Sequence, residues 1–214
     1  MKKGLFISLE GPDGSGKSTQ LQLLNAFLNK EGYDVVVTRE PGGTPIGEKI
    51  RGILLDKDHA EMSGATEMFL YAASRAQHVS EMIKPALDQG KIVICDRFID
   101  SSIAYQGFGR KLGEPVKIIN EFAVNRCMPD ITFLLKLSPE AGAFRIKTKN
   151  KDRLECELTD FYKEVSKGYD ELEKMYPGRV VGIDAAESIE GVHSIIRSRV
   201  ETVLKGNYDI RRYK

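Results

Sequence analysis

With 214 residues, 41% of them hydrophobic, and a formal charge of +1, the chain is typical of a single domain with a large core and has no overall affinity for polyanions such as nucleic acids. Its three scattered cysteines exclude a disulfide framework or a Cys-x-x-Cys site, and no run of 18 apolar residues could cross a membrane. We therefore expect one domain over residues 1–214 in a reducing cytoplasm, with neither nucleic acid nor a membrane as a partner.

The first predicted strand leads directly into the most informative motif of the chain. Residues 5–9 are apolar, and Gly11-x4-Gly16-Lys17-Ser18 follows with the spacing of a P-loop. Residues 18–30 then carry leucines at helical spacing, so the motif lies between a strand and a helix, where a phosphate-binding loop belongs. The residues expected to bind a nucleoside triphosphate are Gly11, Pro12, Asp13, Gly14, Ser15, Gly16, Lys17, Ser18 and Thr19.

The chemistry of this loop assigns roles to two of its side chains. Lys17 should reach the β and γ phosphates, and the Ser18 hydroxyl should bind Mg2+. The glycines allow backbone N–H groups to close around a phosphate without Cβ clashes, and the helix that follows adds the positive end of its dipole. Mg2+ is therefore the expected cofactor.

Strands and helices alternate along the rest of the chain. Further strands are predicted at residues 35–38, 92–95, 131–137 and 180–183, and helices at 44–55, 65–88, 115–126, 139–147, 157–175 and 188–204. Pro85 should interrupt the long third helix. Apolar strands separated by helices are typical of a parallel sheet that is covered on both faces. The sequence therefore predicts an α/β fold with a five-stranded parallel sheet.

Polar clusters follow three of these strands, at residues 10–18, 39–43 and 96–98. The carboxyl ends of parallel strands lie at one edge of the sheet, and ligands of such folds bind there. We therefore expect the three clusters to converge on a single site.

A P-loop by itself leaves three classes open: a switch GTPase, a motor or transport ATPase, and a small-molecule kinase. A guanine-specific switch needs an Asn-Lys-x-Asp element, and the near match at residues 150–153 ends in arginine within a charged loop. The polar clusters are rich in arginine, whose planar fork pairs bidentately with phosphate oxygens. This composition suits a nucleoside monophosphate kinase, which needs no general base because its acceptor is already a phosphate anion.

Over nearly its whole length the chain resembles the bacterial thymidylate kinases. The matching segments are residues 6–19, 38–44, 69–78, 96–110 and the end of a charged loop at 152–155. The resemblance implies a P-loop NTPase fold with a small lid, a homodimer, and transfer of the ATP γ-phosphoryl group to dTMP with Mg2+, giving ADP and dTDP on the route to DNA precursors. Two alternatives stay open: a kinase for another monophosphate such as dUMP or CMP, and a P-loop module that hydrolyses nucleotide slowly.

The resemblance also implies an acceptor site for dTMP. Tyr71 matches the aromatic residue that stacks on thymine, and Arg75 matches the arginine that hydrogen-bonds the base. Ser102 and Gln106 match positions near the N3 edge of the base, and Tyr105 matches a tyrosine packed against the sugar, where a 2′-OH would not fit. The other acceptor contacts implied are Asp13, Glu40, Pro41, Arg51 and Arg97.

The residues that stabilise charge during phosphoryl transfer are expected in the P-loop, at the end of the third strand and in a lid. Arg97 matches the arginine that clamps the acceptor phosphate, and Asp96 resembles a Walker-B acid that would share Mg2+ with Ser18. Gly14 stands where some members have an arginine, which implies the other arrangement, with charge supplied by a lid at residues 142–156. The catalytic residues expected are Asp13, Lys17, Arg97, Lys149 and Arg153, and Arg145 is expected to contact ATP.

Overall fold

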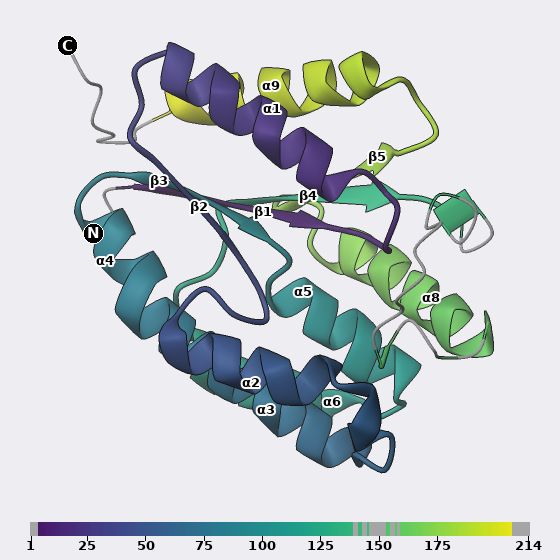
Figure 1. The fold of residues 1–214 in the computed structure, drawn as a ribbon. Helices are drawn as coiled ribbons and strands as arrows, with labels where there is room; N and C mark the ends of the chain where they lie inside the picture. Colours follow the sequence, from purple (N-terminus) through teal and green to yellow (C-terminus); the bar gives the residue numbers. More distant parts are fainter. Residues whose placement is uncertain are drawn as a thin grey trace.

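The computed structural model describes residues 4–138, 141–142, 145, 153–154, 157 and 159–206. Within them the chain forms a five-stranded parallel sheet with the strand order β2-β3-β1-β4-β5 (Figure 1). The strands are β1 (Leu5–Glu10), β2 (Val35–Arg39), β3 (Ile92–Asp96), β4 (Ile131–Lys136) and β5 (Val180–Asp184). The α/β fold class and all five predicted strands are confirmed.

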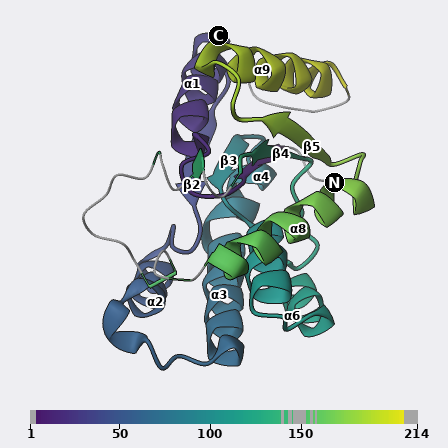
Figure 2. The ribbon, with the colours of Figure 1, turned by 90° about the vertical axis from the view of Figure 1, so that its right-hand side faces the viewer.

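Helices cover both faces of the sheet (Figure 1 and Figure 2). On one face lie α1 (Lys17–Lys30) and α9 (Ile189–Lys205), packed against Leu5, Ile7 and Leu9 of β1. Phe6 of the same strand points to the opposite face, where it contacts the helices after β2. The three central strands β1, β3 and β4 are buried on both faces, so their sequences are mostly apolar instead of alternating.

The opposite face carries the helices that build the site. The predicted third helix runs as α3, a π-helical turn η2 and α4, so that Pro85 falls in the first turn of α4, where its missing N–H is tolerated. The elements of this layer are α2 (Pro45–Leu55), η1 (Lys57–His59), α3 (Gly64–His78), η2 (Val79–Ile83), α4 (Lys84–Asp88), α6 (Glu114–Val124) and α8 (Thr159–Met175). None of the described helices has the length and apolarity that a membrane crossing requires.

One helical segment near the site has no counterpart in the sequence prediction. Residues 99–109, for which we predict no element, form α5 (Ile99–Ser102) and the π-helix η3 (Ile103–Gly109). Glycines weaken helical propensity here, but they permit close packing, since a Cβ on Gly109 would lie 2.6 Å from the Phe161 ring of α8. Tertiary packing therefore overrides local propensity. The helix predicted at 139–147 lies mostly outside the described residues.

Leu24 of α1 provides a test of the core between the sheet and the α1–α9 layer. The side chain is fully buried, so Leu24→Ala should lower the free energy of unfolding by about 2–5 kcal/mol, because a cavity replaces its contacts. Urea denaturation measures this change. Ile195→Ala, at a 42% exposed position of α9, is the control and should cost less than about 1 kcal/mol. Equal losses in the two variants would contradict this packing.

Candidate active site

The P-loop connects β1 to α1 and leaves the start of α1 without a side-chain cap. Gly16 is the N-cap, with φ of 92°, and the first turn contains no acidic residue. Gly11 has φ of 133°, and a Cβ there would lie 2.4 Å from the Leu135 carbonyl oxygen, so only glycine fits. The N–H groups of this first turn therefore face a position suited to a phosphate anion.

The Lys17 side chain is folded back within the loop. Its Nζ donates to the carbonyl oxygens of Gly11 at 3.0 Å and Pro12 at 2.9 Å, and it lies 3.9 Å from Asp13 Oδ1. Burial lowers the pKa of Lys17 to about 8, an effect that the charge of Arg97 reinforces and that of Asp13 opposes. A phosphate in the loop would stabilise the charged ammonium.

Ser18 and Asp96 face each other beside the P-loop. Ser18 Oγ donates to Asp96 Oδ2 at 3.5 Å, while Asp96 Oδ1 is buried without a partner among the described residues. An unpartnered carboxylate oxygen next to a hydroxyl fits Mg2+, which prefers oxygen ligands and retains water and phosphate oxygens in its shell. The described part of the chain has no cluster of three His, Cys, Asp or Glu side chains that could hold a metal, so the fit rests on these two residues and the nucleotide.

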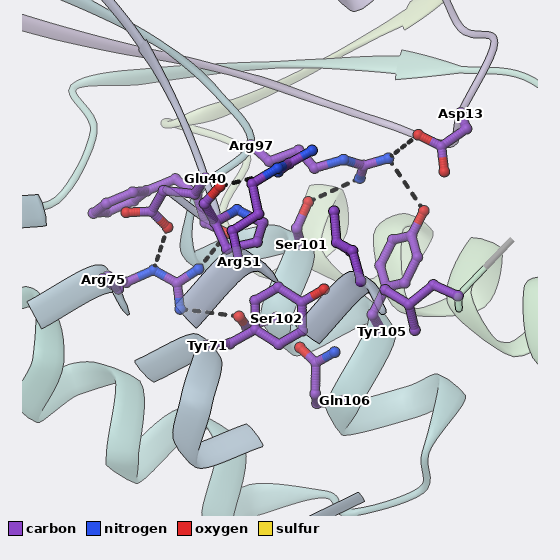
Figure 3. Close-up of a pocket in the computed structure, with 14 residues that line it drawn as sticks. Asp13, Glu40, Arg51, Tyr71, Arg75, Arg97, Ser101, Ser102, Tyr105 and Gln106 are labelled. Atoms are coloured by element: carbon purple, nitrogen blue, oxygen red, sulfur yellow. Dashed lines mark hydrogen bonds and ion pairs between the residues drawn. The ribbon is translucent and has the colours of Figure 1, made fainter. Parts of the chain in front are cut away.

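Two cavities meet at the carboxyl edge of the sheet. The donor cleft is lined by six P-loop residues (Asp13, Gly14, Gly16, Lys17, Ser18 and Thr19) together with Arg39, Glu40, Arg51, Asp96, Arg97 and Arg145. The acceptor pocket (Figure 3) is lined by Asp13, Glu40, Pro41, Arg51, Leu55, Tyr71, Arg75, Arg97, Phe98, Ser101, Ser102, Tyr105, Gln106 and Leu154. Asp13, Glu40, Arg51 and Arg97 line both, so a group bound in one cavity lies directly against a group bound in the other.

Arg97 is held rigidly where the two cavities join. Its Nη2 donates to Asp13 Oδ1 at 2.6 Å, and its Nη1 donates to Ser101 Oγ at 3.1 Å and to Tyr169 Oη at 3.2 Å. Its guanidinium lies over the Tyr105 ring, 5.1 Å from the centroid (Figure 3). Burial tends to raise the pKa of Asp13, but the charges of Arg97 and Lys17 and the hydrogen bond from Arg97 together lower it. An ionised, fixed pair therefore stands where two phosphates would meet.

Glu10 at the end of β1 lies behind Arg97. It accepts hydrogen bonds from the Phe98 backbone N–H at 2.7 Å and from Ser101 Oγ at 2.5 Å. Burial, with the charge of Asp100, raises the pKa of Glu10 to about 7. Phe98 follows Arg97 directly and Ser101 contacts its guanidinium, so Glu10 positions Arg97 through both neighbours.

The far end of the acceptor pocket is built from α3 and the segment 98–106. Tyr71 and Arg75 lie one turn apart on α3, and both line the pocket. Arg75 is 1% exposed and donates to Glu40 Oε2 at 2.8 Å and to Ser102 Oγ at 2.9 Å (Figure 3). His78, fully buried, contacts Glu40 Oε1 through Nδ1 at 2.9 Å. This end of the pocket is therefore fixed by hydrogen bonds before any ligand binds.

The structure gathers most of the predicted site residues. Every residue predicted to bind the acceptor lines the acceptor pocket. Arg145 lines the donor cleft, where its guanidinium donates to the Gly14 carbonyl oxygen at 3.4 Å. Gly11, Pro12 and Ser15 line neither cavity and form the loop around Lys17.

Arg153 also lines neither cavity. It is 8% exposed, and its Nη2 donates to Glu67 Oε2 at 2.6 Å while its Nε donates to the Leu54 carbonyl oxygen at 2.8 Å. We expected Arg153 at the transferring phosphoryl group ahead of Arg145. Instead, a buried carboxylate on α3 holds its guanidinium away from the donor cleft. Lys149 and most of the lid at 142–156 lie outside the described residues.

Several residues of the site have no assignment in the sequence analysis. Ser101 could have been found as the neighbour of Ser102 within the same motif. Glu10 belongs to the polar cluster predicted at residues 10–18, although the sequence assigned it no role. Glu67 and Tyr169 lie on distant elements and carry no local signal, since only the fold brings them to Gln106 and Arg97.

A family model described as thymidylate kinase matches residues 9–196. Thymidylate kinases of Exiguobacterium sp. and Caldanaerobacter subterraneus subsp. tengcongensis are each 51% identical to the chain, over 206 and 205 residues. Each alignment covers 95% of this chain, and 97% and 98% of the two relatives. The crystal structure of thymidylate kinase from Ehrlichia chaffeensis superposes with a TM-score of 0.75 at 34% identity, covering 92% of this chain and 98% of that one.

Glu10 gives a pH-dependent test of the network behind Arg97. Its pKa is raised from 4.5 to about 7, so between these values the folded protein binds more protons than the unfolded chain. This contribution to the free energy of unfolding is therefore present at low pH and lost as the pH rises through about 7. Glu10→Gln removes the part of the pH dependence that comes from Glu10. The free energy of unfolding of the wild type minus that of the variant should therefore fall between about pH 5 and about pH 8.

Urea denaturation across this pH range measures the difference. Glu190→Gln, on the exposed first turn of α9, is the control and should follow the wild type. A constant difference between wild type and Glu10→Gln would contradict the role of the buried carboxylate.

Proposed function

This chain belongs to the thymidylate kinase family, and we propose that it transfers the γ-phosphoryl group of ATP to dTMP, giving dTDP and ADP with Mg2+ as cofactor. The observation that carries the proposal is the meeting of the donor cleft and the acceptor pocket at Asp13 and Arg97. A P-loop protein that only hydrolyses nucleotide does not require a second binding pocket lined by aromatic side chains. The cytoplasmic location expected from the sequence stays a prediction.

On the donor side, the phosphates of ATP lie against the first turn of α1. Lys17 exchanges the carbonyl oxygens of Gly11 and Pro12 for the β and γ phosphates. Ser18 and Asp96 would hold Mg2+, which would supply positive charge against the phosphates. No residue has to remove a proton, because the acceptor is a phosphate anion.

On the acceptor side, the phosphate of dTMP lies beside Arg97 and Arg51 at the junction of the cavities. Tyr71 stacks on the base, Arg75 and Gln106 face its edge, and Tyr105 packs against the sugar where a ribose 2′-OH would not fit. Arg97 is already oriented by its contacts, so alignment and charge stabilisation need little reorganisation during transfer.

Arg145 supplies the donor-side charge in this proposal. Gly14 leaves the P-loop without an arginine, and the Arg145 guanidinium lies against the Gly14 carbonyl oxygen and donates to the Ala185 carbonyl oxygen at 3.1 Å. A cation at this position can stabilise charge on the equatorial oxygens of the moving phosphoryl group. Lys149 and Arg153 stay candidates for a closed state of the lid.

The protein also forms a homodimer in this proposal, through an apolar face on α3 and α6. Phe122 of α6 is 91% exposed, and Ile118, one turn earlier, is 59% exposed. Phe122 shares a surface groove with Ala76 of α3, and Phe69 lies two turns before Ala76 on that helix with 58% exposure. Exposed aromatic side chains in a continuous face are characteristic of a protein interface, and a second copy offers the same face.

A coupled assay with a panel of monophosphates tests the reaction. We expect the highest kcat/KM for dTMP, lower values for dUMP, CMP and AMP, and slower ATP hydrolysis without an acceptor.

Lys17→Ala should lower kcat by at least about 100-fold, because the positive charge of the lysine beside the β and γ phosphates is lost. A preference for CMP or AMP, or near-normal turnover by folded Lys17→Ala, would overturn the assignment.

Sedimentation velocity tests the dimer. Phe122→Asp should convert the dimer to a monomer, because it places a charge in the centre of an apolar interface. Met175→Asp on α8 is the matched control, since this residue is 57% exposed but lies outside the face, and it should leave the assembly unchanged. A monomeric wild type, or a dimer that persists in Phe122→Asp, would refute the proposed interface.

A further inference from the structure

The amide of Gln106 is held from behind by a carboxylate. Its Nε2 donates to Glu67 Oε1 at 2.9 Å, and the residue is 1% exposed. Gln106 lines the acceptor pocket, into which its amide is directed (Figure 3). Its carbonyl oxygen accepts no hydrogen bond from any residue that the structure describes. One side of the amide is therefore satisfied by the protein, and the other faces the ligand.

Glu67 can only accept hydrogen bonds in this environment. Arg110 donates to it through Nε at 3.2 Å and Nη2 at 3.0 Å, and Arg153 donates at 2.6 Å. Burial would raise the pKa of Glu67, but hydrogen bonds from Arg110, Gln106 and Arg153, together with the charge of Arg110, lower it. An ionised carboxylate has no donor, so only the NH2 group of Gln106 can face it. The carbonyl oxygen of Gln106 must then point into the pocket.

We propose that Glu67 is a positioning residue that sets base specificity, because it fixes the Gln106 amide so that only a base with an N–H donor at N3 is matched. Thymine and uracil carry this N3–H, whereas N3 of cytosine is an acceptor and would face the Gln106 oxygen without a proton between them. A buried acceptor left unpaired disfavours the wrong base strongly. The inference rests on the proposed function and assigns a new role to a residue outside the pocket lining.

The position of Glu67 on α3 supports this role. Glu67, Tyr71 and Arg75 follow one another at intervals of one turn, so the same helix face supplies the orienting carboxylate, the aromatic wall and the base-edge arginine. Arg110 and Arg153 neutralise the carboxylate, which allows it to stay charged while buried.

The variant Glu67→Gln tests the proposal because it keeps the shape of the side chain. Its remaining oxygen can stay with the arginines, which turns its NH2 group toward Gln106 and reverses the Gln106 amide. The ratio of kcat/KM for dTMP to that for dCMP should fall by at least about tenfold, mainly through KM, because the contact is made in the bound ground state. Glu157→Gln is the matched control: it removes the ion pair between Glu157 and Arg110 but keeps Glu67, its two arginines and the Glu67–Gln106 hydrogen bond, so the ratio should not change.

A ratio of kcat/KM for dTMP to dCMP that stays at the wild-type value in folded Glu67→Gln, or an equal fall in Glu157→Gln, would overturn the proposal. If circular dichroism shows that Glu67→Gln does not fold, Gln106→Met replaces it, since this variant keeps Glu67 and its arginines. In Gln106→Met the ratio of kcat/KM for dTMP to that for dCMP should also fall by at least about tenfold. An unchanged ratio in this variant would overturn the inference. Failure of the proposed function is a separate outcome, because the wild-type protein would then show no preference for dTMP.

Discussion

The ion pair between Asp13 and Arg97 is the contact around which the rest of the site is arranged. It joins the P-loop to the end of β3, and it lies where the donor cleft and the acceptor pocket meet. Arg97 adopts φ of 67°, which is unfavourable for a residue with a Cβ, and it is kept there by Glu10, Ser101 and Tyr169. A partly buried ion pair contributes little net stability after desolvation. Its position at the junction of the cavities therefore indicates a role in phosphate alignment.

Buried carboxylates organise the acceptor pocket in the same way. Glu40 holds Arg75 against the pocket wall and is itself contacted by His78, while Glu67 holds Gln106. Each carboxylate satisfies donors that would otherwise be unpaired in the interior, so the groups facing the ligand have one orientation before binding. A pocket fixed in this way loses little conformational freedom when a nucleotide binds, which favours discrimination between similar bases.

The π-helix η3 connects this pocket to α8. It brings Tyr105 and Gln106, which are adjacent in sequence, to the lining of the same cavity. A Cβ on Gly168 of α8 would lie 2.9 Å from the Cα of Ala104, so the two elements approach closely only because glycine is present. This contact also brings Tyr169, the next residue of α8, within reach of Arg97. Irregular helical geometry thus serves the site, as is common for π-helical turns.

The sequence alone determined the P-loop, the five strands and the predicted residues that line the acceptor pocket, because each depends on local order: a motif between a strand and a helix, apolar runs of strand length, and family motifs within short segments. The tertiary structure decided what no local pattern encodes. Arg153 pairs with Glu67 across 86 positions of the chain, and Tyr169 meets Arg97 across 72, through buried polar contacts that have no period along either helix. The helical segment 99–109 likewise depends on its packing against α8, since its own glycines oppose a helix. Long-range pairing of buried charge depends on which elements the fold brings together, so it could be recognised only once the sheet order and the helix layers were known.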